Sequence, residues 1–330
     1  MNATLNKHAS NGSTRDAALG ELPRFDEAEV ARHDADAHRV LTDSGSQTAA
    51  RCSLWWRNTP ALTGHRIGLI GHYAARDDDA GDRILKQACA ELAASGCTLA
   101  VGPMDGCTWR RYRFVTETGY EPPFFLEPEN PSSWPRQFAS AGFKALAHYC
   151  SALTDRLDCE PPQARLAAER LGALGVTLRP LEPSRWDEEL NTIYRITTAG
   201  FQGGFLYQPL PESEFLALYR QVRPFVRPEL VLFAMHDGRP VGFVFNIPDA
   251  LQARRGRSID TVILKTLAIL PDRRYAGLGC HLTQQSHRVA RELGYRRVVH
   301  ALMHEKNASI NLSARYGKVF RRYTLFARPL

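Results

Sequence analysis

Apolar residues recur along the chain at two spacings, and the two spacings alternate. In the first half, short apolar runs typical of buried strands occur at residues 51–56, 65–75 and 97–103. Between the last two runs, apolar residues recur at three- and four-residue steps and Gly96 follows, which predicts an amphipathic helix containing Ile84, Leu85, Ala88, Leu92 and Ala93. The order is therefore strand, helix, strand.

The same order returns in the second half. Strands are predicted at 176–183, 261–271, 296–307 and 319–329, with a hairpin over 229–249 that turns at Asp237-Gly238. Helices are predicted at 184–201, with Ser184 as its N-cap, and at 213–226, 277–294 and 309–316. Because helices alternate with strands and hairpins are also present, we expect an α/β fold with a mixed sheet.

The remaining segments suggest how the chain is divided. Residues 1–22 lack periodicity and are expected to be a flexible tail, and the charged, Ala-rich stretch Phe25–Leu41 is expected to be a helix. Residues 155–175 look like a connection with one helix in it. We therefore expect a first domain at 23–158, a linker at 159–175 and a second domain at 176–330.

Composition and charge narrow the class of protein. Of 330 residues, 44% are hydrophobic and 23% are charged, which excludes a disordered chain. The net charge is +7, and the positive excess lies in residues 176–330, which hold 23 Lys and Arg and 13 Asp and Glu, whereas residues 1–175 hold 19 and 22. These charges are scattered, so a phosphorylated small molecule explains them as well as a polynucleotide does. The seven cysteines contain no C-x-x-C pair, which argues against a disulfide framework and a structural zinc.

The lengths of the apolar runs and the composition of the N-terminus bear on membrane insertion and secretion. The longest apolar runs fall well short of the roughly 20 residues that cross a bilayer, and the N-terminus lacks the apolar core of a signal peptide. We therefore expect a cytoplasmic protein with no membrane partner.

The sharpest local signal is the stretch Ile269–Gly279, ILPDRRYAGLG. A strand runs into a loop with two glycines, and an amphipathic helix follows at once. Glycines at such a junction let backbone N–H groups converge on an anion, and the helix N-terminus favours negative charge. The stretch therefore predicts a phosphate site, although glycines that serve only a tight turn would give the same pattern.

This stretch resembles the acyl-CoA binding signature of the GCN5-related N-acetyltransferase (GNAT) superfamily. Ile269 matches its first, branched position, and Arg274, Gly277 and Gly279 match the positions that follow. The surrounding order of strands and helices is similar as well, over about residues 176–330. The resemblance implies two tandem GNAT-like domains, of which the second is intact.

The resemblance also implies a co-substrate, acetyl-CoA or another acyl-CoA, and no metal. The backbone of Leu267 and Ile269 would bind the pantetheine arm, which needs a strand splayed from its neighbour. Asn307 matches an asparagine of the family. The phosphates would be held by Arg274, with Arg273 and Arg288 as further candidates, and by the backbone amides of Tyr275, Ala276, Gly277, Leu278, Gly279 and Cys280.

The implied reaction is attack of a neutral amine on a thioester, with a base that accepts a proton and an acid that protonates the thiolate. The family's usual tyrosine acid is replaced, since Ser313 stands at its place, and Tyr316 is the nearest substitute. Glu305 is the expected base. Alternatives are Asp260, His300 and His304, whereas a nucleophilic role for Cys280 is not favoured.

The first half resembles a degenerate copy of the second. Its loop carries Asp77, Asp78, Asp79 and Asp82 in place of the glycine signature, and these acids would repel a pyrophosphate. We therefore expect one acyl-CoA per chain.

The function expected from the resemblance is acyl transfer to the amine of a small molecule. The alternative is a non-catalytic acyl-CoA sensor, and a weaker one is transfer from aminoacyl-tRNA. No nucleic-acid partner is expected, and the chain could form a homodimer.

Overall fold

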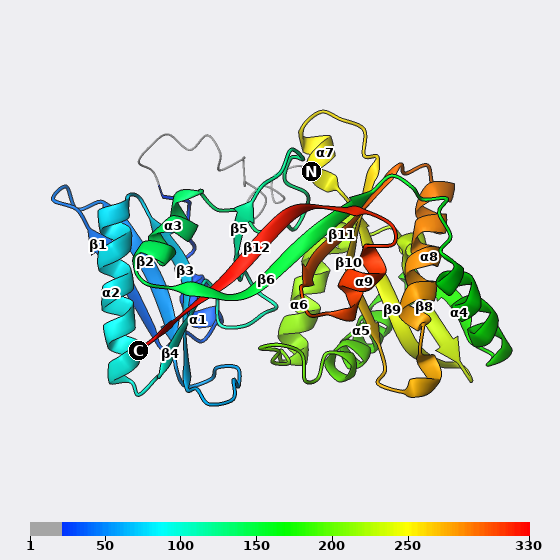
Figure 1. Cartoon of the computed structure of the whole chain (residues 1–330), viewed down its shortest axis with the longest axis horizontal. Coiled ribbons are helices and arrows are strands. Elements are labelled where there is room, and N and C mark those ends of the chain that lie inside the picture. The colour runs from blue at the N-terminus through cyan, green and yellow to red at the C-terminus, as the bar shows by residue number, and fades with distance from the viewer. Residues whose placement is uncertain (1–21) are drawn as a thin grey trace. The chain divides into compact units, whose positions relative to one another are not determined.

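The computed structural model describes residues 22–330, so the tail expected at 1–22 lies, but for its last residue, outside the described part. The chain forms two compact units. The first contains the chain up to Thr116, with Pro128–Ala147 and Tyr323–Leu330, and the second contains Glu117–Glu127 and His148–Arg322. Figure 1 labels the elements of both.

The first unit contains a mixed sheet covered by a long helix. Strands β1 (Ala37–Thr42), β2 (Thr48–Trp55) and β3 (Ile67–Ala75) are antiparallel neighbours. Helix α2 (Asp78–Ala94) then leads to β4 (Leu99–Gly102), which lies parallel to β3. The helix buries Ile84, Leu85, Ala88 and Leu92, which join the core of this unit, so the predicted strand, helix, strand order is observed.

The helix expected over Phe25–Leu41 is wrong for most of its length. Helix α1 covers only Ala28–Arg32, and the chain leaves it at Asp34, whose φ is 51°. Strand β1 follows and pairs with β2, with Ala37 opposite Leu54. Here pairing with a neighbouring strand overrides the helix propensity of an Ala-rich sequence.

The second unit repeats this topology. Strands β7 (Thr177–Pro180), β8 (Val231–His236), β9 (Arg239–Pro248) and β10 (Thr261–Ile269) are antiparallel neighbours in this order. Strand β11 (Arg297–His304) lies parallel to β10. The predicted turn between β8 and β9 is present, since Asp237 and Gly238 both have positive φ, as such a tight hairpin turn requires.

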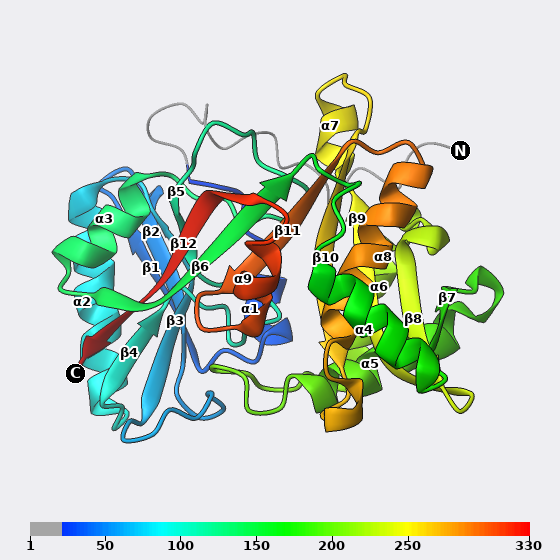
Figure 2. The same ribbon diagram turned by 45° about the vertical axis from the view of Figure 1, so that its right-hand side comes forward.

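Helices cover both faces of this sheet. Val244 of β9 belongs to the core under α8 (Leu278–Glu292) and α4 (Pro162–Ala173). Its neighbour Phe245 packs against Tyr219 of α6 (Glu212–Val222), beside α5 (Trp186–Gly200), on the opposite face. Figures 1 and 2 both show α4 beside α8. Short helices α7 (Ala250–Arg254) and α9 (Ala308–Ser313) flank the sheet.

Two details differ from the sequence prediction. Ser184 is not the N-cap of α5, because a 3₁₀ turn at Pro183–Arg185 precedes the helix and Arg185 occupies the cap position. The segment expected as a linker contains α4, whose buried Ala167 and Leu171 share a core with Leu278 and Leu282 of α8. This segment is therefore part of the second unit.

Two strands contribute to both units. Strand β6 (Lys144–Thr154), which follows α3 (Ser133–Ser140), pairs antiparallel with β11 through Thr154 opposite Val298. Strand β12 (Lys318–Pro329) pairs antiparallel with β4 through Phe326 opposite Gly102, and also with β5 (Phe114–Glu117). Each unit thus contains a mixed sheet covered by helices, so the predicted α/β class is confirmed.

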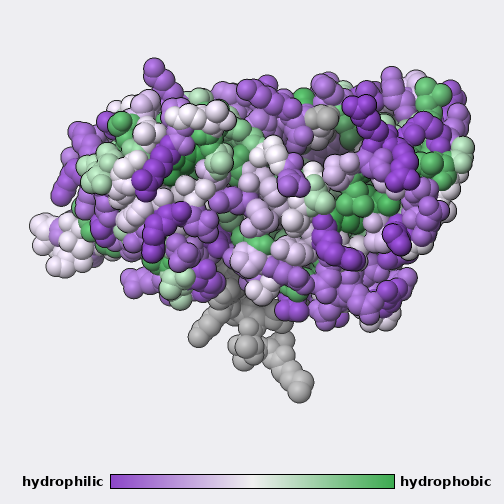
Figure 3. All heavy atoms as spheres, turned by 90° about the horizontal axis from the view of Figure 1, so that it is seen from below, coloured by the Kyte–Doolittle hydropathy of each residue, from purple (hydrophilic) through white to green (hydrophobic). Residues whose placement is uncertain are grey.

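No helix in the described part of the chain combines the length and the apolar character that a transmembrane segment requires. Figure 3 shows one face of the molecule, on which hydrophilic residues predominate and hydrophobic ones occur in separate groups.

Candidate functional site

The loop singled out in the sequence joins β10 to α8 as expected. A 3₁₀ turn at Arg273–Tyr275 is capped by Asp272, whose side chain accepts a hydrogen bond from the Arg274 amide. Gly277 follows at the N-cap of α8 with φ 81° and ψ −7°, a left-handed conformation that favours glycine. Ala276 and Gly277 are exposed, so the first turn of α8 presents backbone amides to solvent, as an anion site requires.

The loop is braced from α4. Arg170 donates one hydrogen bond to the Arg274 carbonyl at 3.0 Å and another to the Ala276 carbonyl. Sequence reasoning missed Arg170, because nothing in its local pattern places it beside residues more than 100 positions away.

Two of the three arginines predicted to bind phosphate, Arg274 and Arg288, have partners within the protein. Arg274 forms a bidentate ion pair with Asp272, at 2.7 and 2.9 Å. Arg288 lies 3.8 Å from Glu292 on the same helix. Tyr275 is buried, and its hydroxyl lies 2.9 Å from His236 Nδ1. The backbone amides of Tyr275 and Ala276 donate to the carbonyl oxygens of Asp272 and Arg273, so these two amides are already bonded within the loop.

The strand before the loop separates from its parallel neighbour. In the described chain, β10 pairs with β11 only from Thr261 to Leu264, whereas its pairing with β9 continues to Ile269. A bulge between Leu264 and Thr266 marks the change. The backbone at Leu267 and Ile269 thus lies beyond the last pair with β11, where a splayed strand was expected.

Tyr316 lies against the first turns of α8. Its hydroxyl donates a hydrogen bond to Gln284 Oε1 at 3.1 Å and is hydrogen-bonded to the Cys280 side chain. Burial, together with Cys280, raises the pKa of Tyr316, so the phenol stays protonated at neutral pH. Arg315 lies on the other side of the thiol, with Nη1 3.9 Å from Cys280 Sγ. The structure therefore brings Tyr316 and Cys280 together.

A row of buried polar side chains extends behind Tyr316. The His287 ring packs edge-on against the Tyr316 ring, and its Nε2 lies 2.8 Å from His300 Nε2. His300 Nδ1 is hydrogen-bonded to Ser313, which donates to Met303 Sδ at 2.9 Å. Burial lowers the pKa of His300 to about 4, so this imidazole is neutral at pH 7.

These buried polar side chains include two residues named in the sequence analysis, His300 and Ser313. His300 is enclosed in the core with its ring nitrogens bonded, which is the environment of a structural histidine. Ser313, at the place of the family's tyrosine, binds this histidine. Sequence reasoning missed His287 and Gln284, although both share the inner face of the predicted helix.

The other predicted residues lie at the end of β11. Glu305 and Asn307 are exposed, and Glu305 makes no side-chain hydrogen bond or ion pair with Tyr316 or Cys280 in the described chain. His304 lies between the rings of Tyr149 and Phe205.

Asp260 is held by its neighbours. It accepts hydrogen bonds of 2.7 Å from both Gln252 and Thr261. Burial opposes its ionisation, but these bonds and Arg297 outweigh that effect and lower the pKa of Asp260. A carboxylate held in this way is a poor base.

The corresponding strand-to-helix junction of the first unit, between β3 and α2, is lined by acidic side chains. Asp77 caps α2 by accepting from the Ala80 amide at 2.8 Å, which occupies the helix N-terminus with a carboxylate. The Gln137 side chain, held by the Tyr73 hydroxyl, donates to the Asp77 carbonyl and to Asp78. A Cβ at Gly81 would meet Gln137 at 2.9 Å, so the junction is filled as well as acidic.

Comparisons with known proteins agree with this geometry. Residues 190–317 match the acetyltransferase (GNAT) family. A bacterial ceramide synthase of Caulobacter vibrioides is 27% identical over 234 residues, which are 70% of this chain and 59% of that protein. The chain thus spans less than two thirds of that relative.

Two solved structures share the fold. One is a GCN5-related N-acetyltransferase from Sphaerobacter thermophilus, with a TM-score of 0.50 and 15% identity, covering 93% of this chain and 86% of that one. The other is the GCN5-related glucosamine N-acetyltransferase region of a fungal multi-domain β-N-acetylglucosaminidase, with a TM-score of 0.53 and 12% identity. It covers 91% of this chain and 34% of that one. Residues 190–317 therefore form a domain of the acetyltransferase (GNAT) family.

Proposed function

We propose that the second unit transfers an acyl group from an acyl-CoA to an amine. The observation that carries this proposal is the position of Tyr316, whose protonated hydroxyl lies beside Cys280 in the first turn of α8. The same turn presents the amides of Gly277–Gly279 to an anion. A proton donor and the proposed phosphate site would thus share one helix end, as transfer from a thioester of a phosphorylated carrier requires.

The residues of the chain then have separate roles. The amides from Gly277 to Cys280 would bind the pyrophosphate, and the backbone of Leu267 and Ile269 would hold the pantetheine arm beyond the last pair with β11. The amine nitrogen attacks the thioester carbonyl, so a C–N bond forms and the C–S bond breaks. Tyr316 gives its proton to the departing thiolate, and the amine loses one proton to a base.

The base is the least defined part of this proposal. Glu305 remains the candidate because it is an exposed carboxylate at the end of β11. His300 and Asp260 are less suited, since the ring nitrogens of the one and the carboxylate of the other are already bonded within the protein.

The acceptor is proposed to be a primary amine. The sequence predicts the amine of a small molecule. The name of the Caulobacter relative favours a second candidate, the amine of a long-chain amino alcohol, since a ceramide is the N-acyl derivative of such a base. Both acceptors require the same step at the thioester.

The test measures thiol release and acyl-amine product with an acyl-CoA series and both classes of amine. Tyr316→Phe is expected to lower kcat about a hundredfold or more and to leave the Kd of acyl-CoA nearly unchanged, because the hydroxyl acts on the leaving group. Tyr120→Phe removes a hydroxyl from a fully exposed tyrosine of the same unit and serves as control.

Two results would contradict the proposal. Full activity of Tyr316→Phe would remove the assigned acid. Tight acyl-CoA binding by the wild type, without transfer to any amine, would favour the sensor function.

A further inference from the structure

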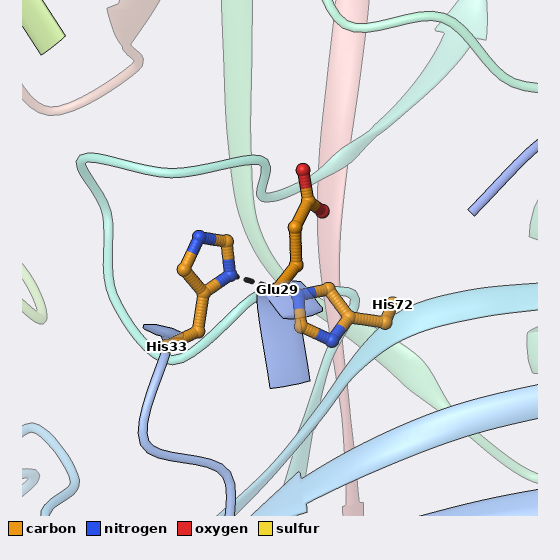
Figure 4. A group of neighbouring side chains, drawn as sticks. All are labelled: Glu29, His33 and His72. Carbon is orange, nitrogen blue, oxygen red and sulfur yellow. Dashed lines mark hydrogen bonds between the residues drawn. The ribbon is translucent and has the colours of Figure 1, made fainter. Parts of the chain in front are cut away.

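A second group of chemically active side chains lies in the first unit, apart from the residues discussed so far. Glu29 and His33 are four residues apart at α1, so they lie on the same side of this helix. His72 comes from the middle of β3, where its φ of 46° departs from ordinary strand geometry. Figure 4 shows the two imidazoles facing each other, with Glu29 beside them.

We propose that Glu29, His33 and His72 bind a single zinc ion. One ligand atom from each residue lies within 4.8 Å of the other two. His33 Nδ1 and His72 Nε2 are 2.8 Å apart. Around tetrahedral zinc, with bonds of about 2.0–2.1 Å, donor atoms lie about 3.3 Å apart. The two imidazole nitrogens would therefore have to separate by about 0.5 Å, and the Glu29 oxygen would have to approach them by at most about 1.5 Å.

The outer contacts of His72 fit a ligating histidine. Its second nitrogen, Nδ1, lies 2.9 Å from Ser53 Oγ, which in turn lies 2.8 Å from His38 Nδ1. Such a bond fixes the tautomer and directs Nε2 toward the metal, as second contacts of metal-binding histidines do. The His72 backbone is also fixed, since its amide donates to the buried Asp105 carboxylate at 2.6 Å.

Charged groups of both signs surround the imidazoles. Two carboxylates face them, because Asp105 Oδ2 lies 3.9 Å from His72 Nε2 in addition to Glu29. The opposing charges are Arg32, Arg110 and Arg111. Arg32 is paired with Asp26, and Arg110 Nη1 is bonded to the carbonyl oxygens of His33 and Asp105.

Aromatic rings enclose the group on the protein side. The ring centroids of Phe25 and Trp55 lie 5.1 and 5.3 Å from that of His72. Trp55 Nε1 also donates to the His33 carbonyl at 2.8 Å, which fixes the end of α1. Aromatic rings exclude water and lower the local dielectric constant, which strengthens the attraction between an ion and its ligands.

The ligand set identifies the class of ion. Two imidazoles and one carboxylate are a common set for zinc, and they leave a fourth position for water or for Asp105. Calcium and magnesium are disfavoured because they prefer oxygen ligands. The proposal is independent of acyl transfer, since all of its residues belong to the first unit.

The test is calorimetric titration of the chelator-treated, untagged full chain with Zn²⁺, with bound zinc counted by elemental analysis. One ion per chain is expected. His33→Ala and Glu29→Gln should each weaken binding at least tenfold, and Ser53→Ala should weaken it about 10–100-fold through His72. His65→Ala changes an exposed histidine of the same unit and should bind as the wild type does.

The variants were chosen so that folding does not decide the outcome. The side chains of Glu29 and His33 are only partly buried, so these two variants should keep the wild-type circular dichroism. Cobalt gives a second measurement, because its visible absorption depends on its ligands and should change in Glu29→Gln. Absence of zinc binding by the wild type would overturn the proposal, and so would equal losses in His33→Ala and His65→Ala.

Discussion

Alanine substitutions at the two loop glycines should have different effects. Gly277→Ala should lower the stability of the second unit, whereas Gly279→Ala should weaken acyl-CoA binding. In Gly277→Ala, the residue must keep a φ near 81°, which costs a side chain about 1–2 kcal/mol. The added Cβ would also lie 3.0 Å from the Cβ of Ala167 on α4, a tighter approach than ordinary packing allows. We expect a loss of unfolding free energy of about 1–2 kcal/mol, and more if α4 cannot move.

Gly279→Ala provides the matched comparison. Its Cβ would lie 3.5 Å from Ile269 Cδ1 and 3.6 Å from Leu267 Cδ2, which are ordinary contacts, and its φ is not positive. Since Gly279 is inside the first turn of α8, alanine should leave stability unchanged or raise it by up to about 1 kcal/mol. The new methyl group would, however, stand where we place the pyrophosphate.

Urea denaturation followed by circular dichroism, together with titration of acyl-CoA, distinguishes the two effects. Gly277→Ala should shift the denaturation midpoint to lower urea. Gly279→Ala should keep the midpoint and raise the Kd of acyl-CoA, and Gly279→Glu should raise it further. If Gly279→Ala lost as much stability as Gly277→Ala, our reading of the loop conformation would be refuted.

Three further predictions follow from the contacts described above. Arg170→Ala removes two hydrogen bonds to loop carbonyls and should raise the Kd of acyl-CoA about tenfold. Arg165 is exposed on the same helix, so Arg165→Ala should leave this Kd unchanged. Titration with acyl-CoA measures both. Neutral His300, with its pKa of about 4, stabilises the fold above pH 6.5, and this contribution is lost as the pH falls toward 4, by at most about 1.4 kcal/mol per pH unit. Urea denaturation across pH 4–7 should therefore show a flatter profile for His300→Gln than for the wild type. Calorimetry should also find one acyl-CoA per chain, because Asp77 and Gln137 occupy the corresponding helix end of the first unit, and a value near two would contradict this reading.

The pattern of apolar residues predicted most of the fold, because each long helix and each buried strand carries its own periodicity. It failed where a distant strand decides the structure. Residues 37–42 end the stretch 25–42, whose earlier part is Ala-rich and charged, and pairing with β2 makes them a strand. The residues of α4 likewise gave no sign that Ala167 would pack under α8.

In the candidate site, the local sequence predicted the residues of the loop but not the residues that contact it. Glycines at a strand-to-helix junction have few other uses, so Gly277 and Gly279 could be located from the sequence alone. The contact between Tyr316 and Cys280 joins residues 36 positions apart, and the brace from Arg170 spans more than 100. Such contacts depend on how β12 and α4 pack, which no short motif encodes.

The pairing of β12 with β4 has a consequence for biosynthesis. Phe326 lies opposite Gly102, so the sheet of the first unit is incomplete until more than 200 further residues have been translated. Until then β4 lacks this antiparallel neighbour, and its exposed edge is open to pairing with other chains. An N-terminal fragment that ends at residue 158 should therefore aggregate during expression, whereas a chain that includes β12 should complete the first unit.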